Sequence, residues 1–184
     1  MSQELEALAE LAELEQLEPA GEPTLEPGVS VERLNRWERR IQAEILIPHP
    51  VAPVWQVLTD YEALADFIPN LAVSRRLAHP EAKIRLEQVG TQPLLKINFR
   101  ARVVVDIEEI YPQQIHFTCV AGDFSRFDGA WHLHPEATAT RLSYAVHLRP
   151  RANLPVRWIE GRITRGIQVN LLAIRQRVGQ LMVP

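Results

Sequence analysis

Cysteine is almost absent from this chain of 184 residues, which contains only Cys119. An intramolecular disulfide needs two cysteines and a zinc site built on cysteine needs several, so the sequence excludes both. The neighbouring residues Phe117, Thr118 and Val120 have the composition of a β-strand. We therefore expect Cys119 to be a buried, unreactive thiol.

Long apolar runs are also missing. A membrane-spanning helix needs roughly 18 apolar residues in succession, whereas the longest uninterrupted runs here, such as residues 103–105, are only a few residues long. Residues 1–6 lack the basic and apolar regions of a secretory signal. We expect a cytoplasmic protein, peripheral to a membrane if it contacts one.

Basic residues are absent from the first 30 positions, which contain eight glutamates. Since the whole chain has a net charge of −3, the remainder carries +5. Between residues 5 and 17, leucine occurs at every third position, a spacing that shifts around a helix instead of forming one apolar stripe. Residues 19–28 are rich in proline and glycine, which break helices. We expect residues 1–29 to be an acidic, disordered extension with a linker, or a partner-binding helix, and residues 30–184 to be one domain.

The usual catalytic motifs do not occur. The sequence contains no Walker loop, GxGxxG, HExxH, GxSxG or Cys/His metal spacing. His132 and His134 share one face of a predicted strand, but Trp131 and Leu133 occupy its inward face, so we expect the histidines at the surface and not as metal ligands. We accordingly predict no catalytic residue, no metal and no cofactor.

Hydrophobic periodicity predicts an α+β fold. Alternating residues predict a strand over residues 39–48 and six more after residue 70, joined by short turns typical of antiparallel hairpins. Helical spacing predicts two short helices after the first strand and a long helix from Pro155 to about Val178. The later strands are predicted at residues 71–78, 83–90, 94–110, 114–121, 126–135 and 140–148. Pro48 and Pro50 end the first strand, so its partner must lie elsewhere.

Two segments resemble a known family. Residues 51–61, VAPVWQVLTDY, followed by FIPN at 67–70, are similar to the opening of the START-like (SRPBCC) polyketide cyclase/dehydrase and lipid-transport group, which includes coenzyme-Q-binding proteins. Gly129-Ala130-Trp131 and Leu154-Pro155 also match its pattern. The resemblance covers roughly residues 38–180. It implies a helix-grip (START/Bet v 1-like) fold, in which a curved antiparallel sheet wraps around the C-terminal helix, and members of the group bind lipids, quinones, polyketides or hormones.

A curved sheet and one helix cannot touch along their whole length, so we expect a cavity between them, lined by inward residues. Core packing is the alternative role for each aliphatic residue among them. Asn170, an amide on the apolar stripe of the helix, must bond a strand group such as Tyr144 or a ligand oxygen. The predicted ligand-binding residues are Phe99, Phe117, Phe127, Trp131, Tyr144, Ile163, Ile167 and Asn170.

Tyr144 and Asn170 are the only polar groups expected inside, which is little equipment for acid–base catalysis. The predicted function is therefore the binding or transport of an apolar small molecule, such as a lipid, an isoprenoid quinone or a polyketide-like compound. A cyclase/dehydrase of the aromatase type and a regulatory protein-interaction module are the alternatives.

The C-terminal part is basic, with seven arginines and one acid between residues 149 and 184. Its first segment mixes basic and apolar residues, which suits transient contact with an anionic membrane surface. A solvated helix face with Trp158 in the core is the alternative, and no nucleic-acid-binding motif is present, so no nucleic acid partner is expected. The residues expected at the membrane are Arg149, Arg151, Leu154, Arg157 and Trp158.

Overall fold

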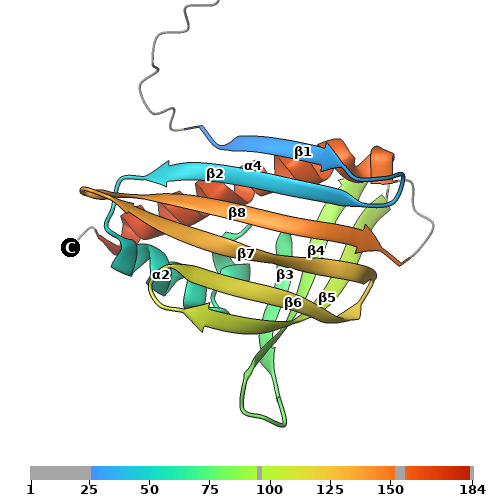
Figure 1. Ribbon diagram of the computed structural model, residues 1–184, viewed down its shortest axis with the longest axis horizontal. Helices are drawn as coiled ribbons and strands as arrows, with labels where there is room; N and C mark the ends of the chain where they lie inside the picture. Colours follow the sequence, from blue (N-terminus) through green and yellow to red (C-terminus); the bar gives the residue numbers. More distant parts are fainter. Residues whose placement is uncertain (1–25, 95–96, 152–155, 183–184) are drawn as a thin grey trace, which may run out of the picture.

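The computed structural model describes residues 26–94, 97–151 and 156–182. In this part of the chain, eight strands form one antiparallel sheet in the order β1-β2-β8-β7-β6-β5-β4-β3 (Figure 1). The strands are β1 (Gly28–Arg33), β2 (Arg39–Ile47), β3 (Leu71–Leu77), β4 (Ile84–Leu94), β5 (Ile97–Ile110), β6 (Gln114–Gly122), β7 (Phe124–Glu136) and β8 (Ala139–Pro150).

Helices cover one face of this sheet. α2 (Val51–Thr59) and α3 (Leu64–Phe67) connect β2 to β3, and α4 (Val156–Leu181) follows β8. The sheet curves around α4, which runs behind it in Figure 1. This is the helix-grip architecture that the sequence predicted. None of the described helices is long and apolar enough to cross a bilayer.

The first predicted strand is confirmed as β2, and its alternation explains its place in the sheet. Ile41, Ala43, Ile45 and Ile47 are buried, while the residues that alternate with them are more exposed. β2 pairs on one side with β8, for example through Ile41 and Val146, so one partner does lie far along the chain, and on the other side with β1, which directly precedes it. The pairing with β8 joins a strand near the start of the domain to the last strand in the sequence.

One strand was not predicted, and the bounds of several elements differ from the sequence prediction. β1 was not predicted, because a six-residue strand directly after a Pro-Gly pair gives only a brief alternation, yet Val29 and Val31 pack against the core. The helix expected over residues 61–68 is limited to α3, since Ala63 closes a turn with Asp60. β4 continues to Leu94, through a region that had been predicted as a turn.

The hydrophobic core lies between α4 and the sheet. Leu171, Ile174 and Val178, on one stripe of α4, are completely buried. The helix packs mainly against α2, α3, β1 and β2. Because its principal contacts are with these elements, space remains between α4 and the middle of the sheet.

Candidate ligand-binding cavity

A cavity of about 270 Å³ occupies the space between α4 and the sheet. Its walls come from the α2–α3 region, from β4 to β8 and from the middle of α4. The lining is mainly apolar, and within the described part of the chain it contains no Lys, Arg, Asp or Glu. The lining residues are Leu58, Tyr61, Leu64, Ile68, Asn70, Leu71, Leu86, Gln88, Gly90, Ala101, Val103, Val105, Ile107, Ile115, Phe117, Phe124, Phe127, Trp131, Tyr144, Ile167, Asn170 and Ile174.

Five aromatic rings from β6, β7 and β8 form one continuous side of the cavity, the aromatic wall. Trp131 and Tyr144 are directly opposite each other across β7 and β8, with ring centroids 4.4 Å apart. Phe117 stacks on Tyr144 with an interplanar angle of 18°, at a centroid distance of 5.8 Å. Phe127 lies 5.6 Å from Phe117 and 5.2 Å from Phe124. Such a wall offers flat π surfaces to a ligand.

Gly129 makes room for this wall. It is paired with Phe117 across β6 and β7. A Cβ atom at position 129 would lie 2.7 Å from the ring of Phe117 and 2.0 Å from the carbonyl oxygen of Ala145. The space beside the strand that a side chain would fill is therefore taken by the Phe117 ring.

Two tyrosines bring hydroxyl groups to the cavity. The Tyr61 hydroxyl donates a hydrogen bond of 2.6 Å to Oε1 of Glu109. Burial raises the pKa of Tyr61, and the bond to Glu109 raises it further. Burial also raises the pKa of Tyr144, whose hydroxyl has no hydrogen-bond partner among the described residues. Both groups stay protonated at neutral pH, and Tyr144 is free to donate to a ligand.

Three side-chain amides add polar atoms to the lining: Asn70, Gln88 and Asn170. Asn70 Nδ2 donates to Oδ1 of Asn170 over 3.2 Å. Gln88 Nε2 donates to Oγ of Ser74 over 3.3 Å. The Nδ2 group of Asn170 has no partner among the described residues, so its two N–H donors remain available.

The arrangement favours binding of a neutral molecule over proton transfer. A charged ligand group would find no counter-ion in the described lining and would lose its hydration. A general base needs a group that can accept a proton near neutral pH, and protonated tyrosines and amides do not supply one. The free donors of Tyr144 and Asn170 match an oxygen acceptor.

The structure brings six of the eight predicted ligand-binding residues together in the cavity lining. Ile163 is not one of them: it lies one helical turn before Ile167 and packs at the edge of the core. The side chain of Phe99, on β5, is outside the described residues. The six that line the cavity are Phe117, Phe127, Trp131, Tyr144, Ile167 and Asn170.

The protein partner expected for Asn170 is corrected. The prediction offered a strand group such as Tyr144 or a ligand oxygen; within the protein, the structure pairs Asn170 with Asn70, just before β3, and the contact with a ligand oxygen stays a prediction. The periodicity of the helix shows which face carries Asn170, but not which loop packs over that face.

Three polar lining residues were missed. Gln88 had a usable signal, because it continues the alternation of Ile84 and Leu86 on the inward face of β4. Asn70 follows the family-like FIPN segment, where it looked like a helix terminator. Tyr61 stands in a turn, and no periodicity indicates the direction of a turn residue.

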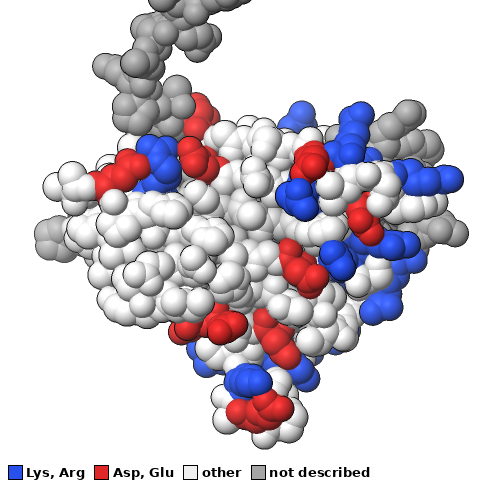
Figure 2. Space-filling view, in the orientation of Figure 1, with Lys and Arg blue, Asp and Glu red and all other residues white. Residues whose placement is uncertain are grey.

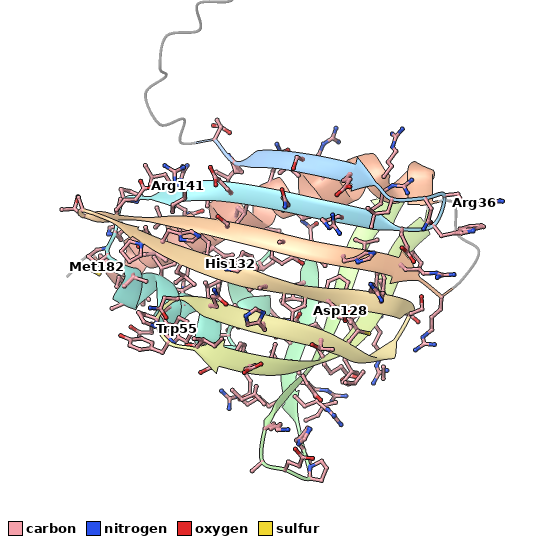
Figure 3. The ribbon with its side chains drawn as sticks, in the orientation of Figure 1. Arg36, Trp55, Asp128, His132, Arg141 and Met182 are labelled. Atoms are coloured by element: carbon pink, nitrogen blue, oxygen red, sulfur yellow. The ribbon has the colours of Figure 1, made fainter. Side chains whose placement is uncertain are left out.

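The groups that were expected to be inert lie outside the cavity lining. Burial raises the pKa of the half-buried Cys119 thiol, with a further contribution from the charge of Asp128. His132, on β7 (Figure 3), stacks against His134 with centroids 6.2 Å apart. Burial lowers the pKa of His132, as do the charges of His134 and His116. Among the described residues, no group of three or more His, Cys, Asp or Glu is arranged to hold a metal ion.

The five residues expected at a membrane are only partly described. Arg149 and Arg151 border a polar hollow at the end of β8. Leu154 lies outside the described residues, as do the side chains of Arg157 and Trp158.

Comparison with known families matches residues 47–174 to the family described as polyketide cyclase / dehydrase and lipid transport. No curated protein matches the chain in sequence. The matched region begins at the end of β2 and ends in α4, so it contains every residue that lines the cavity.

Solved structures share the fold at low identity. A STAR-related lipid transfer protein from Xanthomonas axonopodis has a TM-score of 0.68 and 17% identity, covering 86% of this chain and 96% of that one. The Zhui aromatase/cyclase from Streptomyces sp. R1128 has a TM-score of 0.64 and 15% identity, covering 78% and 94%. Human STARD10 has a TM-score of 0.64 and 12% identity, covering 86% and 71%. Such likeness establishes the fold and not a ligand or reaction.

Proposed function

Because the chain belongs to the polyketide cyclase / dehydrase and lipid transport family, we propose that it binds and carries an apolar small molecule between its sheet and α4. The observation that carries this proposal is the cavity itself, with an aromatic wall and no charged residue in its described lining. Small-molecule sites typically combine an apolar lining with a few orienting polar groups. Tyr144 and Asn170 are the orienting groups here.

The size of the cavity favours a compact ligand. Its volume of about 270 Å³ is just below the range of about 300–1,000 Å³ that is typical of small-molecule sites. A ring compound of the polyketide type, or the head of an isoprenoid quinone, fits such a space better than a whole lipid with two acyl chains. A longer ligand would have to extend beyond the cavity or displace α3 or α4.

The polar groups favour a neutral ligand with an oxygen acceptor. The Tyr144 hydroxyl and the Asn170 amide both offer donors, while the aromatic wall offers flat surfaces against which a ring can stack. A ketone or a quinone satisfies both features. A carboxylate or an amine would enter without a counter-ion.

An enzyme of the cyclase/dehydrase type is the second candidate. The observation in its favour is the Tyr144 hydroxyl, which could donate a hydrogen bond to a carbonyl and polarise it, and the Zhui aromatase/cyclase has a similar fold. A carrier needs no more than binding, whereas a cyclase also needs a base, so we place the carrier first.

We also propose that the basic segment starting at Arg149 makes transient contact with anionic membrane surfaces. Each basic residue close to such a surface contributes about 1 kcal/mol to binding. This contact would bring the carrier to the membrane, where apolar molecules are dissolved and can be taken up. Flotation with anionic and neutral vesicles tests it, and equal binding to both contradicts it.

The decisive experiment for the carrier is native mass spectrometry of the purified chain, followed by organic extraction and identification of the released compound. We expect a bound apolar molecule in the native chain and its loss in the Ile167→Trp variant, because the larger side chain fills the cavity from α4. Ile163→Trp is the matched control, since Ile163 is on the same helix and half-buried but does not line the cavity. This control should retain the ligand.

Equal ligand loss in both variants would mean that the ligand does not occupy this cavity. If the chain converts a polyketide-like substrate, and the conversion depends on Tyr144, the enzyme function would replace the carrier function as the proposal. A stable protein partner in place of a small molecule would favour the regulatory module.

A further inference from the structure

A second site lies away from the cavity, at the end of the sheet formed by the β1–β2 turn, the start of β7 and the end of β8. It is a polar hollow of about 550 Å³ that shares no lining residue with the cavity. Figure 2 shows that basic side chains gather at this end of the visible face, the end at which Arg36 is labelled in Figure 3. The hollow, called here the arginine hollow, is lined by Trp37, Glu38, Ser125, Arg126, Arg149, Pro150 and Arg151.

Two of these arginines, Arg126 and Arg149, stand at positions where the fold does not require a positive charge. Arg126 and Arg149 are direct partners in the register of β7 and β8, where like charges facing each other destabilise a sheet. Both side chains are about half exposed, so an uncharged polar residue would fit either position. Like charges that face each other in this way are an exception to local sequence rules, and such exceptions are expected at functional sites.

The backbone around the arginines is shaped by a bulge. The register of β7 against β8 shifts between Phe124 and Arg126, which leaves Ser125 as the extra residue. Its hydroxyl donates to the carbonyl oxygen of Arg149 over 3.1 Å. The bulge turns Phe124 toward the cavity while Arg126 faces the hollow.

Each guanidinium is anchored on one side. Arg151 Nε donates to the carbonyl oxygen of Gly122 over 3.0 Å. Arg126 Nη1 lies 3.2 Å from Nδ1 of His147, and its Nε is 3.9 Å from Asp128. Arg149 Nη1 donates to Oε1 of Glu38 over 3.3 Å. The remaining N–H groups of these arginines have no partner in the described part of the chain, so every arginine keeps donors for a bound group.

Charge specifies what the hollow can hold. Burial alone would raise the pKa of Glu38, but its hydrogen bond to His147 and the charges of His147 and Arg149 keep that pKa below its usual value. Glu38 therefore stays ionised, and three arginines face one carboxylate across the lining. The lining alone has two more positive than negative charges, and Asp128, next to the lining at 3.9 Å from Arg126, reduces this excess to one. An excess of one to two positive charges matches a phosphomonoester, which carries between one and two negative charges at neutral pH.

We propose that the arginine hollow binds a phosphomonoester group. Guanidinium groups donate paired hydrogen bonds to phosphate oxygens, and three of them, from β7, β8 and the residue after β8, line the hollow. The volume of the hollow holds the phosphate together with part of the molecule that carries it. The phosphate can belong to a lipid headgroup or to a free metabolite. The site goes beyond the cavity function and does not depend on what fills the cavity.

The test is an NMR titration of the full chain with inorganic phosphate, with chloride at equal ionic strength as the reference. We expect saturable shifts of the amide signals of Ser125, Arg126 and Arg151. Arg126→Gln and Arg151→Gln should each weaken phosphate binding about tenfold or more, since each removes a charge-assisted contact.

Arg141→Gln is the matched control. It removes the same charge from the same sheet, but Arg141 lies at the opposite end (Figure 3) and is paired with Glu136 and Glu44. This variant should keep the phosphate affinity of the native chain. Without phosphate, Arg126→Gln should be at least as stable as the native chain, because it relieves the facing like charges.

Binding to vesicles and to a soluble phosphomonoester shows whether the phosphate belongs to a lipid headgroup or to a free metabolite. Binding to phosphatidic acid vesicles well above phosphatidylserine vesicles of equal charge assigns a lipid phosphate. Saturation by glycerol 3-phosphate without that preference assigns a free metabolite. Absence of phosphate-specific shifts, or an equal loss in Arg141→Gln, overturns the site. If the chain binds all anionic vesicles equally, the proposal of general membrane contact stands and the proposal of a phosphate site is rejected.

Discussion

At the scale of single residues, the absence of a side chain at Gly129 is as important as the rings around it. The Phe117 ring lies beside the strand where a side chain of residue 129 would stand. Any larger residue must push Phe117 toward the cavity or separate β7 from β8. The stacking of Phe117 on Tyr144 therefore depends on glycine at this position.

Gly129→Ala should destabilise the protein, because the new Cβ would meet a backbone oxygen at 2.0 Å, and backbone cannot swing aside as a side chain can. Overpacking of this kind costs about 1–3 kcal/mol of the free energy of unfolding. Gly161→Ala is the control: it is on α4, and apart from the backbone of its own helix no atom of the described residues lies within 4 Å of its added Cβ. It should stabilise by up to about 1 kcal/mol. Denaturant unfolding measures both, and equal stability of the two variants would contradict the packing around Gly129.

Alternation in the sequence could predict much of the residue-scale site. Trp131, Tyr144 and Phe117 face the cavity because each stands at an inward position of a long strand. The contact of Asn70 with Asn170 could not be predicted, since it joins residues 100 positions apart through a loop whose direction is set by packing.

At the scale of elements, one carboxylate connects three strands. Glu87 of β4 accepts a hydrogen bond from Arg102 of β5 over 2.6 Å and another from Arg75 of β3. These two bonds lower the pKa of Glu87 below its usual value. The interaction ties β3, at the edge of the sheet, to the strands that form the cavity wall.

The lowered pKa of Glu87 predicts a contribution to acid stability. A carboxyl whose folded pKa is depressed stabilises the protein above its unfolded pKa, about 4, and this contribution is lost as pH falls through the folded value. Glu87→Gln should therefore be less stable than the native chain at neutral pH, and the difference should shrink below about pH 4. Thermal unfolding across pH measures this. Glu32→Gln, which affects an exposed pair with Arg40, should leave the pH profile unchanged, and a constant difference for Glu87→Gln would refute the linkage.

Most elements could be predicted because their periods are long and uninterrupted, as in β5, β8 and α4. The end of β4 could not. Pro93 lacks the N–H of a ladder residue, which normally ends a strand. Here β3 pairs with β4 only as far as Gly90, so beyond that point one side of β4 has no neighbour in the described sheet, and a proline is tolerated there.

At the scale of the whole molecule, charge is unevenly distributed along the chain. Residues 1–25 contain seven glutamates and no basic residue, while the remainder is positive. An acidic segment tethered to a basic body competes with external anions for its arginines, and salt weakens this competition because it screens exposed charges.

Deletion of residues 1–25 should increase binding to anionic vesicles several-fold at low salt, and the increase should vanish at high salt. Vesicle flotation measures this. A full-length variant with all seven glutamates in this segment replaced by glutamine is the control for chain length, and it should behave like the deletion. If the deletion increased vesicle binding and the glutamine variant did not, the charge of the segment would not be the cause of the increase.

The pairing of β2 with β8 also determines the order in which the molecule can be completed. Positions that face each other in this pair, such as Arg39 and Leu148, are separated by more than half of the chain, and contacts of such long sequence separation favour late pairing and slow folding. On the ribosome, β8 emerges after every other strand, and α4 emerges after β8. Until then the aromatic wall has no cover, and an apolar molecule near the nascent chain can settle on it and be enclosed when α4 docks. On the proposed carrier function, the first ligand would be acquired during synthesis, without any later opening of the finished protein.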